Sequence, residues 1–339
     1  MKLLVALIAL MTFSVSLAGA ASDDVYLHAG RLVDIGGFRL NIVCMGTGAP
    51  TVVFDSGLED WAPAWALIQP PVSRITRTCT YDRAGNGLSD RGPLPRTSSA
   101  IVGELHRLLG AAGEKPPYIL VGHSFGGYTA RLFADRYLPD VAGLVLVDSS
   151  NEDEPSLTPP SQRAKESMQW KTFLHQLEHC MHVARATSFA GHPKEKKECP
   201  SQFFRGLPER KFSARLNAEL LREARAWKQY EASLSEAQNF LGPSSREVRA
   251  RQIRYGAVPL RVLTATRHYH FTKKTTQRER TEAFTFERGW QRLQHRWLSL
   301  SRNSRQVLAQ KSGHYIQLDQ PDLVLEAIRE EIDLVKSRP

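Results

Sequence analysis

The pentapeptide Gly122-His123-Ser124-Phe125-Gly126 constrains this chain more than any other feature. It follows an apolar run at residues 118–121 and precedes a stretch compatible with a helix at residues 127–133. Glycines two positions before and two positions after Ser124 remove the Cβ atoms that would clash in a tight turn. We therefore expect a strand, a sharp turn and a helix, with the Ser124 hydroxyl exposed as a nucleophile. An ordinary glycine-rich turn has the same pattern, so the motif needs support from elsewhere in the chain.

Two further motifs supply that support. Residues 81–90 read Tyr-Asp-Arg-Ala-Gly-Asn-Gly-Leu-Ser-Asp, and residues 312–315 read Ser-Gly-His-Tyr. With the pentapeptide between them, the chain resembles the α/β-hydrolases, which carry a D-R-x-G-x-G-x-S loop after strand four, a serine after strand five and a Gly-His step after strand eight. The resemblance extends from about Arg31 to Val335. It implies an α/β-hydrolase fold with a mostly parallel eight-stranded sheet flanked by helices, and a helical cap inserted after strand six.

The remaining sequence alternates short β-branched runs with longer helical patterns, as a parallel sheet with helices on both faces requires. Helices are expected at residues 97–109 and 323–335, where apolar residues recur every three or four positions. Strands are expected at residues 39–43, 51–54, 77–81, 118–121, 143–147, 260–264 and 306–309.

The alternation stops between residues 147 and 260. The region from Asn151 to Ala257 begins with several prolines and continues with helical segments, including a long one from Glu209 to Phe240. Its apolar stripe would form the core of the cap or line a substrate pocket. We therefore divide the chain into a signal peptide (1–20), a hydrolase core in two parts (21–150 and 258–339) and a helical cap (151–257).

The N-terminus predicts export. Lys2 precedes an apolar run at residues 3–17, and small residues at Ala18 and Ala20 suit cleavage before Ala21. The run is short for a membrane span, although an uncleaved anchor is the alternative. We expect a periplasmic or secreted protein.

Four cysteines in an exported chain are able to pair. Cys180 and Cys199 both lie in the inserted region and would close a short polar loop, so we favour that pair. The resemblance places Cys44 and Cys79 on strands two and four, which are neighbours in the α/β-hydrolase sheet. For these two, a disulfide and a pair of buried free thiols both stay open. The sequence shows no cysteine and histidine spacing typical of a metal site, and we expect neither a metal nor a cofactor.

Positive charge is concentrated in one part of the chain. Residues 161–311 contain 30 Lys and Arg against 13 Glu and no Asp, a net charge of +17, whereas the rest carries 15 against 22, or −7. An acidic ligand, an anionic membrane surface or simply solvated helix faces would explain this excess. No recognition motif accompanies the charge, so nucleic acid is not an expected partner. The oligomeric state is not predicted.

The resemblance assigns the catalytic groups. Ser124 is the nucleophile, and His314, in the Gly-His step after the last strand, is its base. Two amides must then bind the oxyanion of a tetrahedral intermediate. The N–H of Phe125 is one of them. The second is expected in the loop after strand three, where we choose Leu58 with Gly57 as the alternative.

The acid is harder to place. It commonly follows strand seven, yet residues 260–277 contain no carboxylate. Some family members place the acid at the end of strand six, where Asp148 follows an apolar run, so we assign Asp148. The alternatives are the three acidic residues at 152–154, or no acid at all. We interpret Asp82, Arg83 and His123 as structural residues, and Trp61 and Trp65 as pocket walls or packing residues.

The expected function is acyl transfer to water. A serine nucleophile excludes the two aspartate-based reactions known on this fold, dehalogenation and epoxide opening. We favour hydrolysis of a small or medium carboxylic ester by a Ser-His-Asp mechanism. One alternative is a lysophospholipid or acyl-lipid hydrolase whose basic cap contacts phosphate head groups. The other is a hydrolase-like binding protein with little turnover, which the missing acid after strand seven would indicate.

Overall fold

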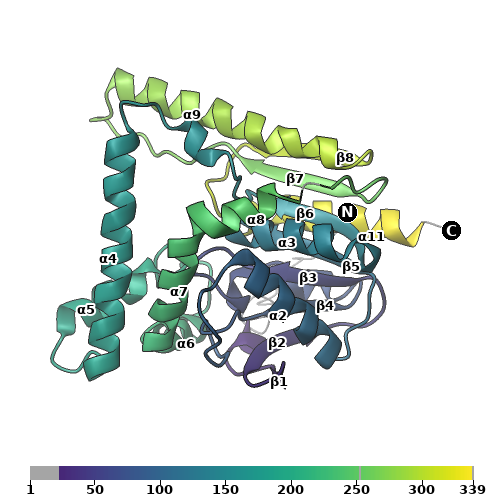
Figure 1. Cartoon of the computed structure of the whole chain (residues 1–339), viewed down its shortest axis with the longest axis horizontal. Coiled ribbons are helices and arrows are strands. Elements are labelled where there is room, and N and C mark those ends of the chain that lie inside the picture. Colours follow the sequence, from purple (N-terminus) through teal and green to yellow (C-terminus); the bar gives the residue numbers. More distant parts are fainter. Residues whose placement is uncertain (1–22, 252, 338–339) are drawn as a thin grey trace, which may run out of the picture.

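An eight-stranded sheet forms the centre of the computed structural model, which describes residues 23–251 and 253–337 (Figure 1). The strand order is β1-β2-β4-β3-β5-β6-β7-β8; β2 runs antiparallel to β1 and β4, and all other neighbours are parallel. This is the sheet that the resemblance implies. The strands are β1 (Arg31–Asp34), β2 (Arg39–Met45), β3 (Thr51–Asp55), β4 (Thr78–Tyr81), β5 (Tyr118–His123), β6 (Val141–Val147), β7 (Leu260–Ala265) and β8 (Ser304–Ala309).

All seven expected strands are present, with ends that differ by at most two residues. The additional strand is β1, an edge strand in which only Val33 is buried. One buried residue in four gives no alternating pattern, which is why the sequence did not reveal it.

The central strands are apolar on both faces because helices cover both faces of the sheet. Val52 and Phe54 of β3 belong to one apolar cluster, and Val53 between them belongs to the other. The first cluster includes residues of α1 (Gln69–Val72) and α11 (Pro321–Lys336), and the second includes residues of α2 (Ser98–Ala111), α3 (Phe125–Arg136) and α8 (Ser245–Arg249). The expected helices at 97–109 and 323–335 are therefore α2 and α11.

The segment between β6 and β7 is helical and stands beside the sheet. In Figure 1, α4 forms a column next to α6 and α7, and α9 crosses above them. The cap and the core share one apolar cluster, so the two are packed together. The elements of this segment are η4 (Glu154–Leu157), α4 (Arg163–Thr187), α5 (Pro193–Glu198), η5 (Pro200–Gln202), α6 (Ala214–Glu223), α7 (Trp227–Asn239), the π-helical turn η6 (Phe240–Ser244) and α8.

The expected long helix from Glu209 to Phe240 was wrong. The structure divides it into α6 and α7, and the backbone is extended at Ala226. Apolar residues of both helices belong to one cluster. Leu216 and Leu220 of α6 pack in the cap, whereas α7 buries polar residues that bind the loop after β4.

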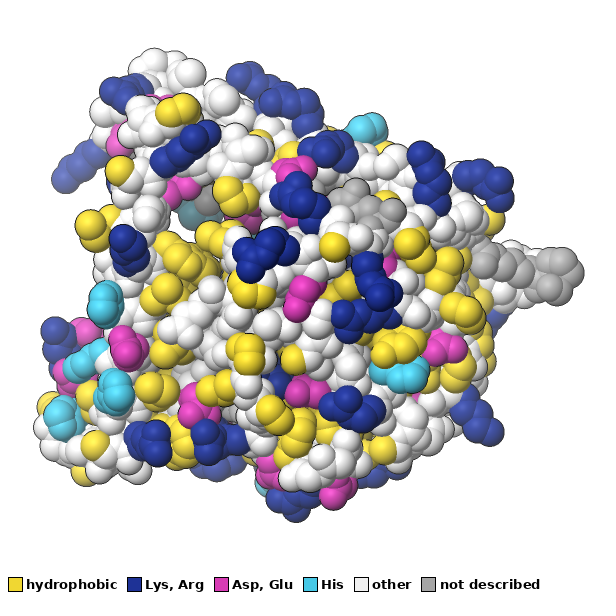
Figure 2. All heavy atoms as spheres, viewed as in Figure 1, with side chains coloured by type: hydrophobic (Ala, Val, Ile, Leu, Met, Phe, Trp, Pro, Cys, Tyr) yellow, Lys and Arg dark blue, Asp and Glu magenta, His cyan; other side chains and the backbone are white. Residues whose placement is uncertain are grey.

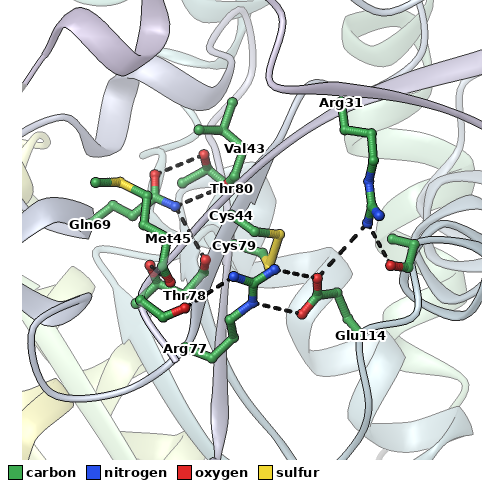
Figure 3. The surroundings of a disulfide bond; sticks show 12 residues. Arg31, Val43, Cys44, Met45, Gln69, Arg77, Thr78, Cys79, Thr80 and Glu114 are labelled. Atoms are coloured by element: carbon green, nitrogen blue, oxygen red, sulfur yellow. Dashed lines mark hydrogen bonds and ion pairs between the residues drawn. A yellow bond between two sulfur atoms is a disulfide. The ribbon is translucent and has the colours of Figure 1, made fainter. Parts of the chain in front are cut away.

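Two disulfides tie the chain together. Cys44 of β2 and Cys79 of β4 are register partners with Cα atoms 4.1 Å apart. Figure 3 shows Arg77 beside this disulfide, donating to both carboxylate oxygens of Glu114 at 3.0 and 2.7 Å. In the cap, Cys180 of α4 binds Cys199, which follows α5. Both pairs that the sequence suggested are therefore formed, and they are compatible with an extracellular protein.

The expected signal peptide at residues 1–20 lies outside the described residues. Within 23–251 and 253–337, no helix combines the length and the apolar character that a membrane span requires.

Candidate active site

Ser124 occupies a strained turn between β5 and α3. Its backbone angles are φ 51° and ψ −121°, in a region that L-residues rarely adopt. The flanking glycines make this turn possible. A Cβ at Gly122 would lie 2.4 Å from the carbonyl oxygen of Gly126, and one at Gly126 would lie 2.3 Å from that of Asp55. The half-buried Ser124 is thus held at the carboxyl edge of the sheet, where ligands of open α/β sheets bind.

The loop after β3 packs against this turn. A Cβ at Gly57 would lie 2.9 Å from Nδ1 of His123, the residue before Ser124. Phe125 is the first residue of α3, so its N–H has no acceptor within the helix. The expected amide donors, Phe125 and Leu58, therefore belong to two segments that are in contact.

Arg83 sets the orientation of that loop. Its guanidinium donates to the carbonyl oxygens of Ser56 and Gly57 at 2.7 and 2.6 Å. In a trans peptide the C=O and the following N–H point in opposite directions. Holding the Gly57 carbonyl therefore directs the Leu58 N–H away from Arg83. The sequence assigned Arg83 a structural role, and the structure adds that it orients the peptide carrying the proposed oxyanion donor.

Asp148 and His314 are in direct contact. Asp148 Oδ2 lies 2.7 Å from His314 Nδ1, and the Asp148 side chain is fully buried. Its second oxygen accepts hydrogen bonds from the Ala265 N–H at 2.9 Å and from Trp290 Nε1 at 2.8 Å. Burial opposes ionisation of Asp148, but His268 and His314 hold its pKa well below the usual range of an aspartate. The lowered pKa favours the ionised form of Asp148 beside His314.

The alternative acids have other partners or other positions. Glu152 pairs with Arg131 at 2.7 Å, and Asp153 pairs with Arg249 and Arg296. Glu154 lies near the site, and burial raises its pKa to about 7 although the charge of His314 opposes that rise. Among the acids that the sequence offered, Asp148 is the one hydrogen-bonded to His314.

Sequence reasoning missed three residues around Asp148. His268 Nε2 lies 2.8 Å from Asp148 Oδ2, and Glu287 Oε2 lies 2.9 Å from His268 Nδ1. Glu287 and Trp290 both come from α9 (Gln277–Arg296), which lies between β7 and β8. The one available signal was a histidine in the place after β7 where the family commonly has its acid.

The other motif residues have packing roles. His123 Nε2 lies 3.1 Å from the carbonyl oxygen of His314, and burial lowers the pKa of His123. Trp61 and Trp65 are buried, and Trp61 Nε1 donates to Glu223 of α6 at 2.7 Å. They are therefore packing residues and are not among the residues that line the cavity described next. Asp82 fixes its own loop by accepting 2.9 Å hydrogen bonds from Asn41 Nδ2, the Ala62 N–H and the Leu88 N–H.

A cavity of about 900 Å³ lies between η4, α4, η6 and α9. Figure 2 shows apolar side chains gathered beside α4 and Lys and Arg side chains over α9. Glu154 is one of the residues that line this cavity, and the charges of His314 and Asp148 act on its pKa. Its apolar walls are Trp170, Phe173, Phe240, Leu241 and Phe286.

Comparison with known proteins agrees with the family resemblance of the sequence motifs. A model of the Alpha/beta hydrolase family matches residues 47–327. The chain is 28% identical over 283 residues to the uncharacterised protein YqjL of Bacillus subtilis, covering 84% of this chain and 83% of that protein. It is 27% identical over 302 residues to an AB hydrolase superfamily protein of Gibberella zeae, with coverage of 85% and 87%.

Two solved structures show the same fold. An esterase from Thermogutta terrifontis matches with a TM-score of 0.56 at 20% identity, covering 91% of this chain and 99% of that one. The epoxide hydrolase CorEH matches with a TM-score of 0.61 at 14% identity, covering 91% and 98%.

Proposed function

The chain belongs to the alpha/beta hydrolase family, and on that premise we propose that it is an exported serine hydrolase that cleaves carboxylic esters. The observation that carries the proposal is a serine in a strained turn combined with the 2.7 Å contact between His314 Nδ1 and Asp148 Oδ2. The contact fixes one nitrogen of His314 as an N–H donor. The other nitrogen is then a free base for the Ser124 hydroxyl.

The mechanism follows from these groups. Ser124 attacks the ester carbonyl while His314 Nε2 removes its proton, and the Phe125 and Leu58 N–H groups stabilise the oxyanion. His314 then protonates the leaving alcohol, which yields an acyl-enzyme. Water repeats the sequence on the acyl group and releases the acid. Asp148 stays ionised throughout and stabilises the imidazolium form of His314.

The residue at the turn separates this proposal from the chemistry of some structural neighbours. Epoxide opening on this fold proceeds through an ester on an aspartate nucleophile, and here the corresponding residue is Ser124. The esterase from Thermogutta terrifontis is a neighbour whose named activity fits a serine. Export is proposed from the N-terminal pattern, and the two disulfides support it.

The apolar cavity favours a second candidate, hydrolysis of an acyl lipid. A volume of about 900 Å³ with aromatic walls would bury a long acyl chain. The net charge of +17 over residues 161–311 would bring the protein to anionic membrane surfaces. Trp170→Ala should then weaken turnover of a decanoyl ester about tenfold relative to an acetyl ester. Met168→Ala, an exposed change on the same helix, is the matched control and should leave the ratio unchanged.

The main test is labelling of the mature protein with a fluorophosphonate probe. Wild type should be labelled, and Ser124→Ala should not. Turnover of p-nitrophenyl butyrate should fall about a millionfold in Ser124→Ala and His314→Ala, and by about four orders of magnitude in Asp148→Asn. A folded wild-type protein that takes no label would instead indicate a binding protein without turnover.

A further inference from the structure

His268 contacts a carboxylate at each ring nitrogen. Nε2 lies 2.8 Å from Asp148 Oδ2, the oxygen that also binds His314, and Nδ1 lies 2.9 Å from Glu287 Oε2. The His268 backbone N–H donates to the other Glu287 oxygen at 2.6 Å. The side chain is 15% exposed, so water contributes little to these contacts.

With both carboxylates ionised, proton counting makes this histidine an imidazolium. Ionised carboxylates only accept hydrogen bonds, and a neutral imidazole has a single N–H to donate. Donation to both Asp148 and Glu287 requires the imidazolium, which has two. Asp148 has no room for a proton of its own, because four donors already surround it: His314, His268, Trp290 and the Ala265 N–H.

We propose that His268 is a permanently charged positioning residue that, together with Glu287, holds Asp148 and sets the pH range in which His314 acts as a base. This inference rests on the proposed serine-hydrolase function. It also gives the segment between β7 and β8 a role. Helix α9 presents Glu287 and Trp290 three residues apart, on one face, to His268 and Asp148.

The surroundings of His268 support a fixed cation. Phe286 and Trp290 pack roughly perpendicular to its ring at centroid distances of 5.7 and 5.6 Å, which holds the ring in place. Burial alone would lower the pKa of His268, but Asp148 and Glu287 raise it to about 10. The charged or titratable groups that face it are Asp148 after β6, Glu287 on α9, His314 after β8 and Glu154 on η4.

The cation changes the electrostatics of the base. The rings of His268 and His314 are 6.2 Å apart, so the charge of His268 disfavours a second positive charge on His314. The negative charge of Glu287, on the other side of His268, has the opposite effect and favours a positive charge on His314. Replacing His268 with a neutral residue should therefore move the acid limb of the pH–rate profile to higher pH. Replacing Glu287 with a neutral residue should move it to lower pH.

The same spacing would also suit a metal ion, because Asp148, His268 and His314 offer ligand atoms within 4.8 Å of one another. The donors already present on both Asp148 oxygens favour protons over a metal. A metal would take the place of the protons on both histidines, which nuclear magnetic resonance distinguishes directly.

The first experiment uses full mature protein with ¹⁵N-labelled histidine. The spectra are recorded on the Ser124→Ala variant, because this measurement does not depend on activity. One histidine should keep both ring nitrogens protonated from pH 6 to 8.5, and its signals should vanish in His268→Gln. A His268 that titrates near pH 6.5, or that loses its protons when zinc is added at equimolar concentration, would overturn the proposal.

The second experiment compares pH profiles of kcat/KM for p-nitrophenyl butyrate. His268→Gln should shift the acid limb up by roughly one pH unit, and Glu287→Gln should shift it down by a similar amount. His270→Gln and Glu282→Gln repeat both changes at neighbouring positions outside the site and should leave the midpoint in place. Shifts in the same direction, or lower kcat with unchanged midpoints, would show a merely structural role.

Failure of this inference is distinguishable from failure of the proposed function. Fluorophosphonate labelling of wild type tests Ser124 without reference to His268. The resonance experiment tests His268 without reference to turnover. Circular dichroism identifies any variant that does not fold. If a His268 or Glu287 variant fails to fold, the resonance spectra of Ser124→Ala decide whether His268 is charged.

Discussion

Arg83 and Glu236 form a buried ion pair with two hydrogen bonds, Nε to Oε1 and Nη2 to Oε2, each 2.9 Å long. Arg83 lies in the loop after β4, and Glu236 lies on cap helix α7. The same guanidinium holds the carbonyl oxygens of Ser56 and Gly57. The pair therefore couples the position of the cap to the peptide that carries the proposed oxyanion donor.

Arg83→Lys should lower kcat for p-nitrophenyl butyrate about 10- to 100-fold with a smaller change in KM. Lysine keeps the charge but loses the fork geometry that holds Glu236 and the Gly57 carbonyl together. Loss of one oxyanion donor lowers kcat by about 100- to 1000-fold in serine hydrolases, and a misoriented donor should cost part of that. Steady-state kinetics at fixed pH provide the measurement.

The matched control is Arg96→Lys. Arg96 also makes a buried two-pronged pair, with Glu104 at 2.6 Å, but it lies outside the loop after β3. Both variants should lose stability, whereas kcat of Arg96→Lys should stay within about twofold of wild type. Equal losses of kcat in the two variants would attribute the effect to general loosening of the fold.

The parts of the site that the sequence predicted are those fixed by local chain geometry. Ser124 and His314 each follow a strand and carry their own glycine pattern, so strand order alone brings them to one edge of the sheet. Asp148 was predicted for the same reason, because it directly follows β6.

The missed parts depend on long-range contacts. Nothing near His268 in the sequence indicates that Glu287 and Asp148 will lie on its two sides, 19 and 120 residues away. The break between α6 and α7 is similar. Ala224, Arg225 and Ala226 favour a helix by propensity, yet the backbone is extended at Ala226, so tertiary packing overrides that preference.

Stability should depend on pH through His268. Its pKa of about 10 in the folded protein lies above the value near 6.5 of an unfolded chain. The stabilisation is therefore complete below about pH 6.5 and is lost as the pH rises toward 10. His268→Gln should lower the free energy of unfolding by about 2 to 4 kcal/mol at pH 6 and by much less at pH 10.

Urea denaturation of wild type and His268→Gln at several pH values gives this difference. His270→Gln should show no such trend, because His270 is exposed. A gap between wild type and His268→Gln that widens with pH would mean that His268 is buried as the neutral form. On the acid side, the lowered pKa of Asp148 stabilises the fold above about pH 4, and this contribution is lost as the pH falls further.

The two disulfides should differ in their effect on catalysis. Cys180 lies on α4, the helix that also presents Trp170 and Phe173 to the cavity. Replacing Cys180 and Cys199 with serine opens a loop with a sequence separation of 19, which should cost about 3 kcal/mol. It should also raise KM for a decanoyl ester more than KM for an acetyl ester.

Replacing Cys44 and Cys79 with serine is the comparison. This pair joins β2 to β4, away from the cavity, so Tm should fall while the ratio of the two KM values stays constant. Thermal melts and kinetics on both esters make the distinction. A constant ratio in both double variants would show that α4 does not shape the substrate site.

Two glycine-to-alanine changes should have opposite effects. Gly126→Ala places a Cβ 2.3 Å from the carbonyl oxygen of Asp55, and the nearest atoms are all backbone atoms of Asp55 and Ser56, which cannot move aside as a flexible side chain can. We expect loss of folded protein or of nearly all turnover.

Gly110→Ala adds a Cβ with no atom within 4 Å, at an exposed position of helix α2. It should raise the free energy of unfolding by about 0.5 to 1 kcal/mol, because alanine has less conformational freedom than glycine to lose on folding. Expression yield, Tm and ester turnover of both variants provide the test, and an active, stable Gly126→Ala would contradict the tight turn on which the placement of Ser124 depends.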